Sequence, residues 1–220
     1  MFRLLFTAII PHGSAPLACT ATMRMKRLRR GDLPPDAVAL ARLLVGKLLV
    51  RDLAGMRFAG RIVETEAFPS RDPSSHGFRG PTRRNRSLFL ERGHAYVYLA
   101  YGSCHCIDVV AEAPGTGSGV LLRALQSVWG IEVMARRRHV TREVDLARGP
   151  GRLAAAMGID LRHDGDLCRD KTLWLAEELD APPLHLGVSA RNGITRARER
   201  RLRFYARGNP YVSGTRRMRE

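Results

Sequence analysis

Successive strand-like segments, joined by short turns, restrict the fold of this chain more than any other feature. Residues 47–52 and 57–68 are both strand-like runs, and Gly55 marks a turn between them. Further strand-like runs, separated by glycine-containing turns, lie at 95–100, 104–111 and 120–125. Strands joined by short turns pair antiparallel, whereas parallel strands need a long crossover, usually a helix. The sequence therefore predicts a sheet in which most pairs are antiparallel.

Helical segments accompany these strands without a regular alternation of strand and helix. The first opens at Leu33-Pro34-Pro35-Asp36, has apolar residues at helical spacing, and stops at Gly46. Two more helices are expected near 130–138 and 151–157, and a last strand at 202–207. This pattern predicts the α+β class, as a single domain with a curved, mostly antiparallel β-sheet core flanked by helices. We expect the domain to span residues 31–213 of the 220.

The two ends of the chain lie outside the expected domain. Residues 1–30 are interpreted as an N-terminal appendage, either a disordered segment or the result of a misassigned start, since Met23 or Met25 could equally begin the protein. A short apolar run ends at Pro11, so a signal peptide or lipoprotein leader is the minor alternative. No apolar stretch approaches the roughly 20 residues of a membrane span, so no membrane association is expected. Residues 214–220 form a basic tail.

The charge of the chain is strongly positive, with a formal net charge of +16. Basic residues gather in four clusters, within residues 24–30, 79–86, 136–138 and 196–203. One such cluster is most simply a solvated face, or a sign of an arginine-rich genome. Four clusters with little acidic compensation indicate a polyanionic partner, and nucleic acid above all.

The four cysteines do not form a metal-binding pattern. Cys104 and Cys106 are spaced too tightly for a zinc loop, and no second pair lies near them. The spacing of an iron–sulfur cluster is also missing. Free thiols in a reducing compartment are the better interpretation. We expect no metal or cofactor, and a cytoplasmic, nucleoid-associated protein.

Candidate site residues begin on the long strand at 57–68. Alternate side chains of a strand share a face, so Glu64, Glu66 and Phe68 point the same way. Taken alone, this segment is most simply an amphipathic strand with a polar outer face. A long loop at 69–86 follows, in which His76 precedes the four arginines within 79–86. Loops of this length in compact domains are usually functional or mobile.

Aromatic side chains on a second strand favour a functional site over a simple amphipathic strand. Tyr96 and Tyr98 share a face of their strand. A carboxylate among aromatic rings can act as a general base on a water, and the rings provide a flat slot for a planar ligand. For so basic a chain that ligand is a nucleic-acid base, because stacking accepts any aromatic face.

The order of these segments resembles the alkyladenine (3-methyladenine) DNA glycosylase family. Residues 61–68, RIVETEAF, are similar to the RIVETEAY motif of that family. Further blocks match in the same order, at 96–98, 101–102, 119–125, 149–151 and 202–210. The similarity runs from about residue 40 to residue 213, most of the chain.

The resemblance implies a base-excision repair glycosylase that acts on double-stranded DNA. Such an enzyme flips an alkylated or deaminated purine (of the 3-methyladenine, 7-methylguanine, hypoxanthine and ethenoadenine class) out of the duplex. It then hydrolyses the N-glycosidic bond and leaves an abasic site. The resemblance further implies a monofunctional enzyme, without a lysine Schiff base, metal or cofactor, and a monomer is expected.

Roles for individual residues follow from the same resemblance. Glu66 is implied to be the general base that activates a water for attack on the sugar C1′. Arg123 is implied to hold that water, together with a backbone carbonyl near Leu186. The residues implied to bind the flipped purine are Phe68, His76, Tyr98 and Asp108, and Tyr101 is implied to fill the gap in the duplex. The residues expected to contact the DNA backbone are Arg84, Asn85 and Arg207.

Three positions depart from the family pattern. Phe68 stands for the usual tyrosine, Arg83 for a proline, and Asp108 for an asparagine that helps to exclude guanine. A carboxylate can accept a hydrogen bond from the guanine 2-amino group and favours a cationic base, so relatively better activity on guanine lesions is expected. The alternative is that Asp108 is salt-bridged to an arginine and behaves like the amide.

Two other functions stay open at this point. A metal-dependent nuclease also uses carboxylates on strands beside basic loops, but it needs about three clustered acids, often with a lysine. No lysine adjoins Glu64 or Glu66. A catalytically diverged damaged-DNA-binding protein of the same fold would keep the charge and the aromatic slot without needing Glu66.

Overall fold

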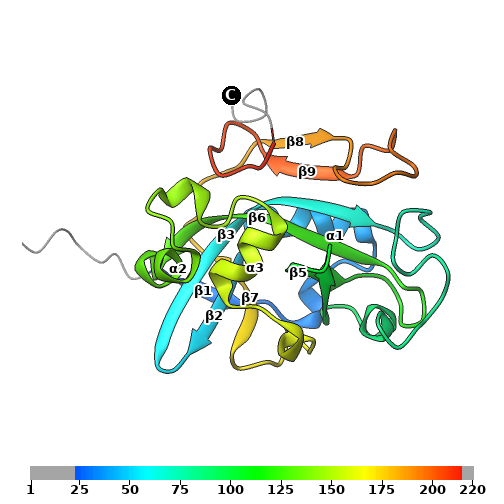
Figure 1. Cartoon of the computed structure of the whole chain (residues 1–220), viewed down its shortest axis with the longest axis horizontal. Coiled ribbons are helices and arrows are strands. Elements are labelled where there is room, and N and C mark those ends of the chain that lie inside the picture. Colours follow the sequence, from blue (N-terminus) through cyan, green and yellow to red (C-terminus); the bar gives the residue numbers. More distant parts are fainter. Residues whose placement is uncertain (1–22, 215–220) are drawn as a thin grey trace, which may run out of the picture.

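A nine-stranded sheet forms the centre of the molecule in the computed structural model, which describes residues 23–214 (Figure 1). The strands are β1 (Met25–Arg27), β2 (Leu48–Leu53), β3 (Met56–Phe68), β4 (Ala95–Ala100), β5 (Cys104–Val110), β6 (Gly119–Trp129), β7 (Leu173–Glu178), β8 (Leu186–Ser189) and β9 (Arg203–Ala206). Their order is β1-β7-β2-β3-β6-β5-β4, with β9 on β3 and β8 on β9, and every pairing is antiparallel. The expected α+β fold is confirmed.

Short helices complete the described part of the chain. The α-helices are α1 (Ala37–Leu44), α2 (Ile131–Arg138) and α3 (Pro150–Met157). Single 3₁₀ turns lie at Arg30–Asp32, Arg86–Phe89, Glu143–Asp145 and Leu161–His163. All three α-helices contribute buried apolar side chains to one main core, which they share with the sheet. The helices therefore pack against the sheet through this shared core.

The β2–β3 hairpin shows the predicted turn. Ala54 and Gly55 both have positive φ, 50° and 78°, between the paired residues Leu53 and Met56. Positive φ at both central residues is the geometry of a two-residue turn that suits the twist of a hairpin. Beyond the end of β2, the second half of β3 pairs with β9, while β6 covers the other edge along almost the whole strand. The strand β3 is therefore interior at the place where the candidate residues lie.

Helix α1 is built as its sequence predicts. The side chain of Asp36 caps it by accepting a hydrogen bond from the N–H of Ala39 at 2.7 Å. Leu40, Ala41 and Leu44 are fully buried on its inner face. Thr65 of β3 donates its hydroxyl to the Ala41 carbonyl at 2.9 Å. This face of β3 is therefore committed to the core, and the opposite face is left for a site.

Three strands were not expected from the sequence. Strands β7 and β8 lie after residue 158, where no strand was predicted before 202–207, and β6 extends past residue 125. Strand β1 lies within residues 1–30 and pairs with β7, so the sheet begins before the expected boundary at residue 31. The suggested leader and all but the first residue of the basic tail lie outside the described residues.

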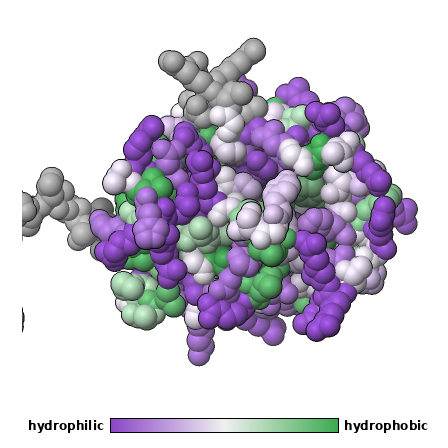
Figure 2. Space-filling model, in the orientation of Figure 1, coloured by the Kyte–Doolittle hydropathy of each residue, from purple (hydrophilic) through white to green (hydrophobic). Residues whose placement is uncertain are grey.

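The face of the molecule drawn in Figure 2 is mostly hydrophilic, with hydrophobic residues in small separated patches. In the described chain, no helix combines the length and the apolar composition that crossing a bilayer requires.

Candidate active site

An irregularity in the pairing of β3 with β6 decides which face carries the glutamates. Ile62 and Ala67 both belong to the main core, although their odd separation would place them on opposite faces of a regular strand. Between Ile62 and Glu64, β3 advances by two residues while β6 advances by one. Such a bulge moves the following side chains to the other face. Glu64 and Glu66 therefore point away from the core that Ile62 enters.

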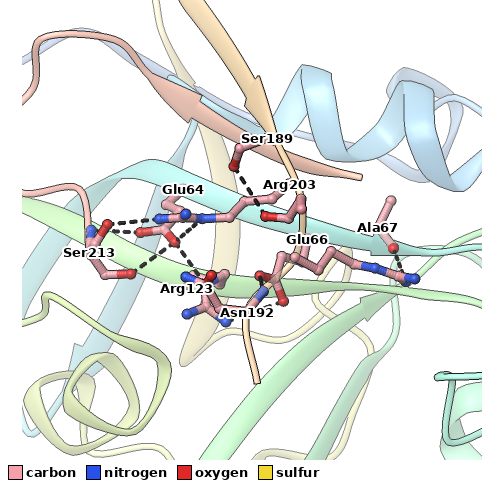
Figure 3. Close-up of polar contacts among 10 residues, drawn as sticks. Glu64, Glu66, Ala67, Arg123, Ser189, Asn192, Arg203 and Ser213 are labelled. Carbon is pink, nitrogen blue, oxygen red and sulfur yellow. Dashed lines mark hydrogen bonds and ion pairs between the residues drawn. The ribbon is translucent and has the colours of Figure 1, made fainter. Parts of the chain in front are cut away.

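Glu64 is completely enclosed and fully hydrogen-bonded (Figure 3). One carboxylate oxygen, Oε1, accepts from the Nε atoms of Arg123 and Arg203, both at 2.7 Å. Ser213 donates its N–H to the other oxygen at 2.7 Å and its hydroxyl to Oε1 at 2.9 Å. Both oxygens of this carboxylate are held by protein donors, so it organises the site and is a poor candidate for a base.

Glu66 lies one position further along the same face and is bonded on one side only. Its Oε1 accepts the N–H of Asn192 at 2.7 Å (Figure 3). Its Oε2 lies 3.2 Å from an Nη atom of Arg123 but has no aligned hydrogen bond among residues 23–214. Burial raises the pKa of Glu66, an effect that Arg123 and the Asn192 N–H oppose and Glu64 strengthens. An immobilised carboxylate with one unbonded oxygen is what a general base for a water requires.

Glu66 borders a pocket of about 430 Å³. Its lining includes Glu66, Phe68, His76, Tyr98, Asp108 and Arg123. Pockets for small ligands begin at about 300 Å³, so a purine fits this volume. The structure thus brings the predicted catalytic and purine-binding residues together, Leu186 excepted.

Aromatic side chains form one wall of this pocket. His76 and Tyr98 meet edge to face with ring centroids 4.6 Å apart, and Tyr96 stacks on Tyr98 at 4.9 Å. The Nδ1 atom of His76 lies 3.0 Å from the Tyr96 hydroxyl. Burial, with a contribution from the Arg84 charge, lowers the pKa of His76, so its imidazole is neutral at neutral pH. Because His76 and Tyr98 touch each other, they provide a joint wall.

Phe68 lines the same pocket, and the guanidinium of Arg191 lies over its ring at 4.7 Å from the centroid. A cation over one face of a ring is a favourable contact in itself. The loss of the phenol hydroxyl found in the family motif leaves this packing intact. Phe68 therefore keeps a defined position in the pocket.

Tyr101 projects from the turn between β4 and β5 at the mouth of the pocket. It is 89% exposed, the highest value among the exposed large hydrophobic residues of the described chain. Its φ is 51°, a left-handed conformation that costs a tyrosine on the order of 1–3 kcal/mol. Strain of this kind is typical of functional sites. The geometry is the one expected of a side chain that enters a duplex.

Asp108 is buried in the pocket without a charged partner. It is 6% exposed, its Oδ1 has no hydrogen bond within the described chain, and no arginine there forms an ion pair with it. The salt-bridged alternative therefore does not hold. Burial raises the pKa of Asp108 to about 8, the Glu66 charge adds to this, and the Tyr98 hydroxyl opposes it. This raised pKa favours the protonated form of Asp108 and so weakens the electrostatic reason to favour cationic bases, and hydrogen bonding of Asp108 to guanine stays a prediction.

The residues expected to contact the DNA backbone differ in their exposure and in whether their polar atoms are already hydrogen-bonded within the protein. Arg84 is exposed at the pocket and donates to the Leu99 carbonyl at 2.7 Å, and Arg207 is exposed after β9. Asn85 is 5% exposed, and its amide donates to two carbonyls and accepts from the backbone and hydroxyl of Thr82. An amide can donate two and accept two hydrogen bonds, so all of these are used. The geometry favours a role for Asn85 in holding the His76 loop.

Leu186 begins β8, pairs with Ala206, and does not line the pocket. From this part of the chain, it is Asn192 that reaches Glu66. Sequence reasoning missed Asn192, although the dipeptide Asn192-Gly193 is a strong turn signal. Asn192 acts through its backbone N–H, which every residue except proline has, so its residue type does not indicate this role. The turn signal was therefore the only clue in the sequence.

A buried charge cluster, also missed, connects the two loops at the pocket. Asp72 is fully buried and forms ion pairs with Arg191 at 3.0 Å and Arg200 at 2.8 Å. Arg191 also donates to the Ala67 carbonyl at 2.9 Å. The loops after β3 and β8 lie at the same end of the sheet in Figure 1, and Asp72 holds them together. The only sequence clue was a single acid at the start of an arginine-rich loop.

Metal-binding side chains do not cluster in the described chain. Within residues 23–214, no group of three or more His, Cys, Asp or Glu could hold a metal ion. Cys104, Cys106 and Cys168 are free thiols, as expected, and Cys19 lies outside the described residues.

The sequence around this site is similar to that of known proteins. The model of the methylpurine-DNA glycosylase family matches residues 32–210. The chain belongs to this family. Similar proteins carry the provisional name 3-methyladenine DNA glycosylase. One from Mesorhizobium japonicum is 58% identical over 194 residues, 88% of this chain and 93% of that protein. One from Paraburkholderia phytofirmans is 45% identical over 192 residues, 87% and 90% of the two chains.

A third relative, from Methanoculleus marisnigri, is 42% identical over 181 residues, 81% of this chain and 94% of that protein. The family match covers β2 through β9 and so includes every residue of the pocket described above. The chain is therefore placed among the DNA glycosylases of base-excision repair.

Proposed function

We propose that this protein removes damaged purines from duplex DNA by hydrolysing the N-glycosidic bond, with Glu66 as the general base. The observation that carries the proposal is that Glu66 lines an aromatic-lined pocket, where the N–H of Asn192 holds its Oε1 and an ion pair with Arg123 holds its Oε2, which accepts no hydrogen bond from the described residues. Glu64 beside it is fully bonded, which leaves Glu66 as the base of the pair.

Hydrolysis needs only groups that the pocket supplies. A water between Glu66 and Arg123 attacks the sugar C1′, its proton passes to Glu66, and the bond from C1′ to the purine breaks. Purines alkylated at N3 or N7 are already cationic and leave readily, whereas neutral lesions need stabilisation of the leaving group. No lysine occurs among the residues that line the described pocket. The reaction therefore proceeds with water as nucleophile, in one monofunctional step that leaves an abasic site.

Recognition uses the exposed groups around the pocket. Flipping a nucleotide costs a few kcal/mol, least for damaged or mismatched pairs, which selects lesions before chemistry. Tyr101 fills the space that the base leaves, and this offsets part of the unstacking cost. Arg84 and Arg207 bind phosphates, in keeping with the net charge of +16. The protein works as a monomer on DNA that contains alkylated or deaminated purines.

Excision from defined duplexes tests this function. Oligonucleotides carrying 1,N6-ethenoadenine, hypoxanthine or 7-methylguanine are incubated with the protein in EDTA, and abasic sites are cleaved with mild alkali. We expect lesion-dependent cleavage in EDTA. Binding without cleavage on every lesion would instead identify a damaged-DNA-binding protein, and strand cleavage that EDTA stops would identify a metal-dependent nuclease.

Replacement of Tyr101 by alanine tests the wedge. We expect Tyr101→Ala to lower the excision rate from duplex DNA by roughly tenfold or more, and from single-stranded DNA much less, because only the duplex has a gap to fill. The measurement is the ratio of single-turnover rates on duplex and single-stranded hypoxanthine substrates. Trp129→Ala, at the far end of β6 and 41% exposed, is the matched control. Equal losses on both substrates would contradict the wedge.

A further inference from the structure

Two carboxyl groups project into the pocket from opposite sides of β6. Glu66 of β3 and Asp108 of β5 are both register partners of Leu121, the residue of β6 between them. Directly opposed residues in an antiparallel sheet project to the same face, and adjacent strands lie about 4.8 Å apart. The two backbones are therefore about 10 Å apart across one strand, with both side chains lining the same pocket.

The surroundings of the two carboxyl groups differ in a way that separates their roles. Glu66 has an arginine at 3.2 Å and a backbone N–H at 2.7 Å, both of which favour its charged form. Asp108 has neither, and is buried with an unpartnered oxygen. Besides Asp108, the titratable and charged groups that line the pocket are Glu66 from β3, Tyr98 from β4, Tyr101 from the turn after β4, Cys106 from β5, Arg123 from β6, His76 and Arg84 from the loop after β3, and Arg196 from the loop after β8. Tyr96 lies opposite Asp108 in register.

We propose that Asp108 is a second catalytic residue, which in its protonated form donates its proton to the departing purine. This proposal rests on the proposed glycosylase function. It also assigns a substrate class, since Asp108 serves neutral purine lesions, whose leaving group needs a proton. When the surroundings of two titratable groups in one site push their pKa values apart, the two groups usually act as a general acid and a general base.

The step balances in atoms and charge. The water oxygen forms a bond to C1′ while the bond from C1′ to the purine nitrogen breaks, and its electron pair stays on the purine. The Asp108 proton moves to a basic ring nitrogen of the purine, and the water proton moves to Glu66. Exchange of one proton with solvent restores both carboxyl groups. Inverting sugar hydrolases use the same division, with acid and base separated widely enough to admit a water between base and sugar.

The pH dependence of the rate follows from this assignment. Asp108, whose pKa burial raises to about 8, loses its proton as the pH rises through that value, so excision of neutral lesions falls on the alkaline side. Glu66 must be ionised, and burial raises its pKa, so excision of every lesion falls on the acid side. Neutral lesions therefore give a bell-shaped profile, whereas cationic lesions lack the alkaline decline.

The experiment compares Asp108→Asn with wild type on two adenine-type lesions that both lack a 2-amino group. Single-turnover excision of hypoxanthine from a duplex is measured from pH 6 to 9.5, alongside release of 3-methyladenine from DNA treated with dimethyl sulfate. Asparagine matches the protonated acid in shape but cannot give up a proton. We expect a loss on hypoxanthine at least about tenfold greater than on 3-methyladenine, and no alkaline decline in the variant.

Several outcomes would overturn the proposal. These are equal losses on both lesions, an unchanged hypoxanthine rate, or an alkaline decline that persists in Asp108→Asn. The two wild-type profiles test it without any variant, because identical alkaline declines on both lesions also refute it. If the proposed glycosylase function itself were wrong, wild type would release neither base, and this result differs from all of those above. Asp180→Asn, at a side chain that is 67% exposed, is the control for handling of the variants.

Discussion

Glu66→Gln is expected to lower the single-turnover rate of excision by roughly 10²- to 10⁴-fold, the range that general bases contribute. Glutamine keeps an oxygen that can accept the Asn192 N–H, but its amide cannot take a proton from water. The flat walls of the pocket are unchanged by this substitution. Affinity for lesion-containing duplex should therefore stay within a few-fold of wild type.

The measurement pairs excision and binding in one buffer. Excision is followed with enzyme in excess over a hypoxanthine duplex, and binding by fluorescence anisotropy of the same duplex. Glu132→Gln, on the exposed side of α2, is the matched control and should behave as wild type. A Glu66→Gln protein that still excises within tenfold of wild type would show that the base lies elsewhere.

Glu64→Gln is expected to cost about 3–5 kcal/mol of folding free energy, although it lies on the same strand face as Glu66. The carboxylate of Glu64 neutralises Arg203, which is fully buried, and Arg123. An amide removes that charge and turns an NH₂ group towards donors. Breaking a buried ion pair on one side leaves the remaining charge without compensation, which is the expensive case.

Thermal unfolding measures this cost. For a chain of this size, 3–5 kcal/mol corresponds to a midpoint lower by roughly 6–20 °C. Glu66→Gln is the matched comparison and should shift the midpoint far less, because Arg123 keeps its ion pair with Glu64 and the Asn192 N–H keeps an oxygen acceptor. A Glu64→Gln midpoint within 2 °C or so of wild type would refute the structural role given to Glu64.

Local signals were sufficient for much of the fold. The helix start at residues 33–36, the turn at Gly55 and the shared face of Tyr96 and Tyr98 on β4 are all features of neighbouring residues, and each appears where it was predicted. Strand β7 was missed because its run Leu173-Trp174-Leu175-Ala176 has no β-branched residue and is rich in good helix formers. Its strand state is imposed by pairing with β2 and β1.

The site depended on distant partners that no local pattern contains. Alternation correctly placed Glu64 and Glu66 on one face, but their types and spacing could not tell the two apart. What separates them are Arg203 and Ser213, which are 139 and 149 positions from Glu64, and the backbone of Asn192. Only the resemblance to a family selected Glu66 before these contacts were known.

Because of the bulge in β3, the site depends on the number of residues in this segment as much as on their types. Deleting one residue at the bulge would turn Glu64 and Glu66 into the apolar core and present Thr65 and Ala67 to the pocket. Substitutions elsewhere along the strand leave this alternation untouched. A substitution in β3 therefore changes one side chain, whereas a single codon gained or lost there would remove both the counter-charge and the base at once.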